Sequence, residues 1–145
     1  MGAALKAGVL YFAIIMTVGF VMGAARELVL VPRLGPIGAV LLEIPVMLAA
    51  SWAVCVSAIR IFNVSHATFP RLVMGFAAFA LLIVAEFGFA NLLFGQAFGT
   101  ALARYQTVTG MIGLAAQFCF AVMPLIVSRI PPPESVAHPD HSVEM

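Results

Sequence analysis

The sequence predicts an all-α fold, namely a polytopic transmembrane bundle of four helices followed by a short disordered C-terminal tail. Its composition is the first reason, because 63% of the 145 residues are hydrophobic and only 9% are charged. The mean hydropathy of +1.13 agrees with this. A water-soluble domain of this size has too large a surface for its volume to bury so many apolar side chains. Lipid is therefore the expected solvent for most of the surface.

Four apolar runs are the second reason, because each can cross a bilayer core of about 30 Å, which takes roughly 20 helical residues. A strand in lipid would leave its backbone polar groups without hydrogen bonds, so each run is predicted to be a helix. The predicted transmembrane domain covers residues 1–127, with helices at residues 7–25, 37–59, 72–94 and 108–127. The first run also resembles a cleavable signal peptide in layout, but its length favours an uncleaved helix.

Local breakers predict the connections between these helices. Pro32 and the pair Gly35–Pro36 interrupt the first connection, and the polar residues 63–70 end in a proline that closes the second. The third connection, residues 95–107, has no strong breaker and has apolar residues at near-helical spacing, which predicts a short interfacial helix. Residues 128–145 contain three consecutive prolines and polar residues, so they are predicted to form a soluble, Pro-rich tail.

Polar residues that are expected to lie inside the bundle gather in one of its halves. With a rise of 1.5 Å per residue, Glu43, Glu86 and Gln117 lie about 9, 12 and 14 Å below the surface that carries the first and third connections. The first helix ends on that same side with charged residues. The candidate site is therefore an intramembrane polar cluster of Glu43, Glu86, Arg26, Glu27, Gln117 and Asn91. The opposite half is predicted to contain no buried ionisable residue.

Glycines and prolines suggest how the helices pack around this cluster. Gly19 and Gly23 form a G-x-x-x-G pair, which predicts close contact with another helix. Pro45 and Pro124 lie within helices and lack a backbone N–H, so each is predicted to bend its helix.

Three functions remain open on these observations. In the first, the charges form ion pairs that hold the bundle together, and the protein is a structural or accessory subunit of a membrane complex. In the second, Glu43 or Glu86 lacks a permanent partner and exchanges a proton, as in a proton-coupled small-solute carrier or an ion channel that acts as a homo-oligomer. The third, an enzyme acting on a lipid-soluble substrate, is the least favoured.

The sequence predicts no catalytic residue, cofactor or metal site. None of the three histidines lies in a predicted helix, and the chain has no G-x-S-x-G motif and no glycine-rich phosphate loop. The net charge of +1 gives no field that would attract nucleic acid. The expected partners are the lipid bilayer and either further copies of the chain or a larger membrane complex.

Positive residues give the expected orientation. Lys6, Arg60, Arg71 and Arg129 lie near one side, against Arg26, Arg33 and Arg104 near the other. By the positive-inside rule, both termini are expected in the cytoplasm, and a bacterial inner membrane is the expected location.

Overall fold

The computed structural model describes residues 1–94 and 98–127, in which every regular element is a helix. The elements in chain order are α1 (Gly2–Ala25), the π-helical segment η1 (Arg26–Leu30), α2 (Val31–Ile61), α3 (Thr68–Phe94), α4 (Phe98–Arg104) and α5 (Val108–Val127). The predicted all-α fold is therefore confirmed, as is the short helix expected in the third connection. The predicted tail, residues 128–145, lies outside the described residues.

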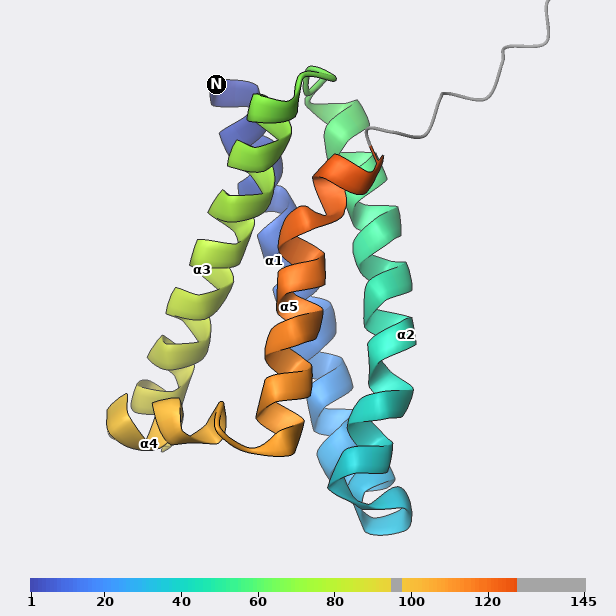
Figure 1. Cartoon of the computed structure of the whole chain (residues 1–145), viewed down its shortest axis with the longest axis vertical. Helices are drawn as coiled ribbons and strands as arrows, with labels where there is room; N and C mark the ends of the chain where they lie inside the picture. Colours follow the sequence, from blue (N-terminus) through green and yellow to red (C-terminus); the bar gives the residue numbers. More distant parts are fainter. Residues whose placement is uncertain (95–97, 128–145) are drawn as a thin grey trace, which may run out of the picture.

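The long helices run alternately in opposite directions and form a bundle (Figure 1). α1 and α3 run away from the end that carries the N-terminus, whereas α2 and α5 return towards it. Three helical stretches of the described chain are long and apolar enough to cross a membrane: Gly2–Ile61, Thr68–Phe89 and Val108–Val127. Since the first stretch holds both α1 and α2, which are antiparallel in Figure 1, the bundle fits a small membrane protein with four passes.

The first connection differs from the expected loop. Helical structure continues from α1 through η1 into α2, and the chain leaves helical geometry at Gly35 (φ 71°, ψ 170°). A positive φ is readily adopted by glycine, so the chain turns there. Pro32 does not break the helix. The wider π-helical turn ends at Leu30, two residues before Pro32, and a regular α-helical bond at Pro32 would need the N–H that proline lacks.

The second connection is shorter than expected, because α3 begins at Thr68 rather than at residue 72. Pro70 is the third residue of this helix, a position whose N–H has no partner within the helix. Arg71 follows and folds back over the connection. Its Nε donates to the Ser65 carbonyl (3.0 Å) and its Nη2 to the Val64 carbonyl (3.3 Å).

Arg71 corrects the prediction that this half of the bundle contains no buried ionisable residue, since it is only 1% exposed. A helical side chain points back towards the helix N-terminus, so an arginine in the first turn can reach the carbonyls of the preceding connection. The apolar end of the bundle is thus closed by a buried cation.

Tight packing characterises this same end. Tyr11 stacks on Phe120 with ring centroids 4.3 Å apart, and its hydroxyl donates to the Phe120 carbonyl (3.3 Å). Two glycines bring helix backbones together. A Cβ on Gly8 would lie 2.8 Å from the carbonyl oxygen of Met74, and one on Gly75 would overlap the carbonyl oxygen of Ala121. We call this end, with Tyr11, Phe120 and the contacts of Gly8 and Gly75, the closed end.

The close contact expected at Gly19 and Gly23 is not found. No atom of the described residues lies within 4 Å of a Cβ built on Gly23, and the neighbour of Gly19 is the terminal methyl of Met47 at 3.5 Å. Pro45 lies exposed on α2, which stays helical through it. Pro124 is buried within α5, and the C-terminal end of this helix changes direction in Figure 1.

Replacing Gly75 by alanine tests the close contact of the closed end. We expect Gly75→Ala to lower the free energy of unfolding by about 1–3 kcal/mol, because α3 and α5 must move apart. Gly23→Ala is the matched control, since its methyl meets open space and alanine favours helix by about 1 kcal/mol over glycine. The measurement is the melting temperature of each variant in mild detergent. Equal melting temperatures for the two variants would contradict this packing.

Candidate functional site

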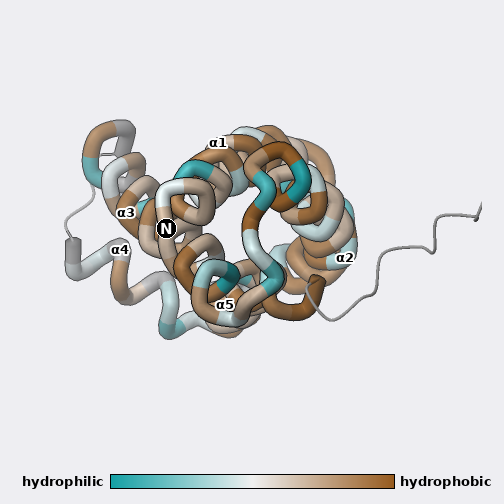
Figure 2. Tube along the Cα trace, turned by 90° about the horizontal axis from the view of Figure 1, so that it is seen from above, coloured by the Kyte–Doolittle hydropathy of each residue, from teal (hydrophilic) through white to brown (hydrophobic). Residues whose placement is uncertain are grey.

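A cavity of about 800 Å³ lies between α1, α2, α3 and α5, in the half of the bundle that carries η1 and α4. Figure 2 shows these helices arranged around a common axis. The wall is mostly apolar, but most of the residues of the predicted polar cluster face it. The polar and charged lining residues are Arg26, Glu27, Glu43, Ser51, Glu86, Tyr105, Thr109 and Gln117.

The cavity ends where the closed end begins. Ile15 and Phe120, both almost fully buried, line it, as does the buried hydroxyl residue Ser51. Beyond this layer the core is filled by Tyr11, which is stacked on Phe120, and by Cys55, which is fully buried. The cavity therefore reaches towards one end of the bundle, and packed side chains separate it from the other.

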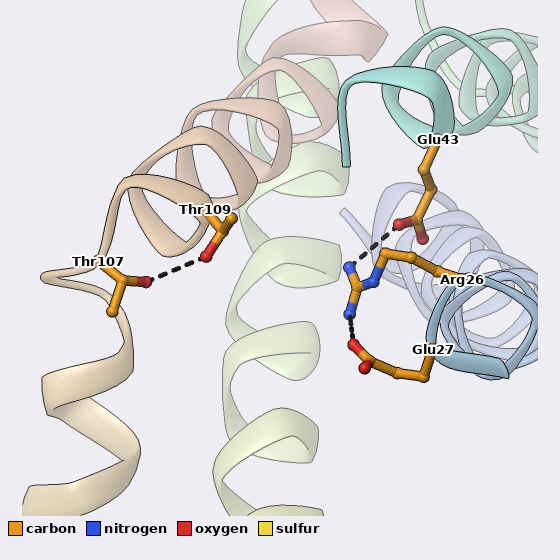
Figure 3. Close-up of polar contacts among 5 residues, drawn as sticks. All are labelled: Arg26, Glu27, Glu43, Thr107 and Thr109. Atoms are coloured by element: carbon orange, nitrogen blue, oxygen red, sulfur yellow. Dashed lines mark hydrogen bonds and ion pairs between the residues drawn. The ribbon is translucent and has the colours of Figure 1, made fainter. Parts of the chain in front are cut away.

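Arg26 forms the first of two polar groups in the cavity (Figure 3). Its Nη1 donates to Oε2 of Glu43 at 3.0 Å, and its Nη2 donates to Oε1 of Glu27 at 3.2 Å. Glu43 is the most buried of the three, with 12% of its side chain exposed, against 30% for Arg26 and 64% for Glu27. The start of η1 thus places one cation between two carboxylates, so we call these residues the Arg26 triad.

Glu86 forms the second group, and its partners are neutral. The hydroxyl of Tyr105 donates to Oε2, and the amide nitrogen of Gln117 donates to Oε1, both at 2.5 Å. Tyr105 lies in the connection between α4 and α5, and its ring is 6.0 Å from that of Phe87. Among the described residues, no cation lies within ion-pair distance of Glu86. We call these three residues the Glu86 group.

The start of α5 holds the Glu86 group in position. Thr107 precedes the helix, and its hydroxyl oxygen accepts a hydrogen bond from the backbone N–H of Gly110 (3.1 Å). Threonine is a favoured residue at this capping position, because it satisfies an N–H that the helix itself cannot. Its hydroxyl also contacts that of Thr109 at 3.2 Å, as Figure 3 shows. The cap fixes where α5 begins, and hence the depth at which Gln117 meets Glu86.

The structure divides the predicted cluster into these two groups. Five of its residues line the cavity: Arg26, Glu27, Glu43, Glu86 and Gln117. Asn91 lies on α3 with an exposed side chain. Gly19 and Gly23, predicted as packing residues, also line the cavity. Their lack of side chains leaves space there instead of permitting helix contact.

Tyr105 and Ser51 are site residues that the sequence analysis missed. Tyr105 lies in the third connection, residues 95–107, which is on the same side of the bundle as Glu86. A hydroxyl close in depth to a buried carboxylate was the available signal. The sequence gives no sign that Ser51 belongs to the site, because a small residue within a membrane helix often serves only in helix packing.

Three chemical observations complete the site. Oε1 of Gln117 is buried and has no hydrogen-bond partner among the residues that the structure describes. Residues 1–94 and 98–127 contain no group of three histidine, cysteine or acidic side chains that could hold a metal ion. The carboxylates of Glu43 and Glu86 line the same cavity. Glu43 is paired with a cation, and Glu86 accepts hydrogen bonds from neutral donors.

The chain matches no protein-family model, no curated protein and no solved structure.

A double-mutant cycle tests the Arg26 triad. Arg26→Gln and Glu43→Gln should each lower the free energy of unfolding, because the first leaves Glu43 without its cation and the second leaves Arg26 with only the exposed Glu27 as a partner. The double variant has neither of these two charges, so we expect it to be more stable than additivity predicts by roughly 1–3 kcal/mol. The quantity measured is the free energy of unfolding in detergent. Strict additivity would show that the ion pair contributes nothing.

Proposed function

We propose that the protein is a carrier that binds a small solute in the cavity and moves it across the membrane. The observation that supports this proposal is the cavity itself, about 800 Å³ in a chain of 145 residues. Cavities that hold small molecules span roughly 300–1,000 Å³ and combine apolar walls with a few polar groups. A bundle with a purely structural role would be more stable with this space filled, because empty volume costs stability.

The asymmetry of the bundle fits transport. A carrier exposes its site to one side of the membrane at a time, by rocking or gating of helices around a fixed site. Here the cavity lies in one half, and the closed end, with Tyr11 stacked on Phe120, fills the other. Gly35 and the π-helical η1 lie where α1 turns into α2, and such irregular turns are suitable places for two helices to change their relative angle.

The accessory-subunit hypothesis needs only apolar faces, and any membrane helix has these. It gives no role to a cavity lined by three carboxylates, those of Glu27, Glu43 and Glu86. A bacterial inner membrane with cytoplasmic termini remains our proposed setting, and the cavity would then face away from the cytoplasm. Further copies of the chain remain proposed partners, since four helices offer little surface for a full transport path.

Filling the cavity tests the carrier proposal. Gly113 lines the cavity, and a Cβ built on it has no atom within 4 Å in the part of the chain that the structure describes. Gly113→Leu should therefore fold normally while occupying solute space. Gly99→Leu is the matched control, because Gly99 is equally unobstructed but lies on α4, outside the lining. The probes are naphthalene derivatives with a neutral hydroxymethyl, a cationic trimethylammoniomethyl or an anionic sulfonate substituent.

We expect at least one probe to raise the melting temperature of wild type and Gly99→Leu by several degrees at about 100 times its Kd, and to leave Gly113→Leu unchanged. The same probe should cross proteoliposome membranes faster with wild type than with Gly113→Leu. Equal stabilisation of all three proteins, no stabilisation by any probe, or binding without flux would each contradict the carrier proposal.

A further inference from the structure

We propose that the solute of this cavity is a lipophilic organic cation, with its charge on Glu86 and its apolar body against an aromatic wall. This proposal rests on the cavity being a solute site, as argued above, and adds the chemical class of the solute. Four lines of evidence support it: the charge balance of the lining, the partners of Glu86, the composition of the wall, and a groove that adjoins the cavity.

The charge balance of the lining is negative. Its described ionised side chains are Arg26 and the three glutamates Glu27, Glu43 and Glu86, so the sum is one positive minus three negative charges, or −2. A cavity with apolar walls strengthens electrostatic attraction relative to water. It therefore favours a cation and disfavours an anion.

The two polar groups differ in how far their carboxylates are already paired with a cation. In the Arg26 triad, the guanidinium donates to both Glu43 and Glu27, so Glu43, the most buried of the three, is already in an ion pair. Glu86 is held by the Tyr105 hydroxyl and the Gln117 amide, which are neutral and leave its negative charge uncompensated. A buried carboxylate in this state gains most from a cationic partner, because charges inside a membrane protein are normally paired.

Aromatic and thioether side chains form much of the apolar wall. The aromatic members are Phe20, Phe89, Tyr105 and Phe120. Aromatic faces attract cations through their quadrupole, and they do so most strongly where water is excluded. Met16 and Met47 also line the cavity, and methionine adapts its shape to different apolar bodies. This wall suits a cation with an apolar, preferably aromatic, body.

A smaller groove of about 310 Å³ adjoins the cavity between α1 and α3. It is lined by Met16, Thr17, Phe20, Val21 and Phe89, three of which also line the cavity. Phe20 is 66% exposed and Phe89 is 44% exposed, so this boundary faces the outside of the bundle. A solute dissolved in the membrane can approach the cavity here without first entering water, which again favours a lipophilic compound.

Tetraphenylphosphonium and tetraphenylborate test the proposal, because they have nearly the same shape and opposite charge. Their binding is measured by equilibrium dialysis against the purified full chain in a non-ionic detergent. We expect saturable binding of the phosphonium and at least about tenfold weaker binding of the borate. Glu86→Gln should weaken phosphonium binding at least about tenfold, whereas Glu86→Asp, which keeps the charge, should preserve the preference for the phosphonium.

Two further variants locate the effect. Glu134→Gln, the same substitution outside the described residues, should bind the phosphonium as wild type does. Glu43→Gln should weaken binding less than about threefold, because the triad is already paired. Loss of binding in Glu43→Gln but not in Glu86→Gln would overturn the assignment to Glu86. The melting temperature of each variant establishes that it is folded.

Failure of this inference is distinguishable from failure of the carrier proposal. Equal affinity for phosphonium and borate would overturn the charge preference and leave a solute cavity in place. The same holds if the neutral naphthalene probe binds and the phosphonium does not. If neither tetraphenyl ion and none of the naphthalene probes binds, both proposals fall.

Discussion

At the crossing of α3 and α5, the carbonyl oxygen of Ala121 occupies the space that a side chain on residue 75 would need. Backbones can approach this closely only at glycine, and in lipid such packing is a main source of helix association. Gly8 makes a similar contact with Met74, so α1 and α5 are both held against α3 at this end. With the helices fixed at one end, no comparable contact is needed at the other. A Cβ on Gly19 would meet only the terminal methyl of Met47, and one on Gly23 would meet no described atom, so the cavity lies between the same helices there.

Charge inside the bundle follows from this arrangement. Each charged group in a membrane interior needs a partner, and the open half supplies partners in two ways. The π-helical turn brings Arg26 to Glu43, and the capped start of α5 brings Gln117 and Tyr105 to Glu86. At the closed end, Arg71 is satisfied in part by the carbonyls of Val64 and Ser65. Glu86 lines the cavity with only neutral hydrogen-bond donors as partners among the described residues, whereas Glu43 is paired with Arg26.

Much of this fold follows from the sequence, because apolar runs of bilayer length have few alternatives to helix. The bounds of α5 and the C-terminal end of α3 agree with the predicted ones, and five residues of the predicted cluster line one cavity. Depth along a helix is set by a constant rise, so the sequence places polar residues well along the membrane normal.

What the sequence could not show is how the helices face one another. The G-x-x-x-G pair at Gly19 and Gly23 has the right spacing but no facing backbone, whereas Gly8 and Gly75 make contact without that motif. The reach of side chains could not be predicted either, since Arg71 was expected only to lie near one side of the membrane and is in fact buried. Proline was misread twice, because Pro32 and Pro70 both lie in first turns of helices, where the missing N–H is tolerated.

The central claim is that water and polar solutes reach one half of the bundle interior from one end. Reaction of introduced cysteines and of the native Cys55 with a sulfonated, membrane-impermeant maleimide tests it in lipid nanodiscs. In a Cys119→Ser background, Gly113→Cys lies in the cavity wall, Phe118→Cys lies on the exposed side of α5, and the native Cys55 is buried in the closed end. We expect rapid modification at residue 113 and none at residues 118 and 55. If residue 113 is as unreactive as residue 118, the half-open bundle is contradicted.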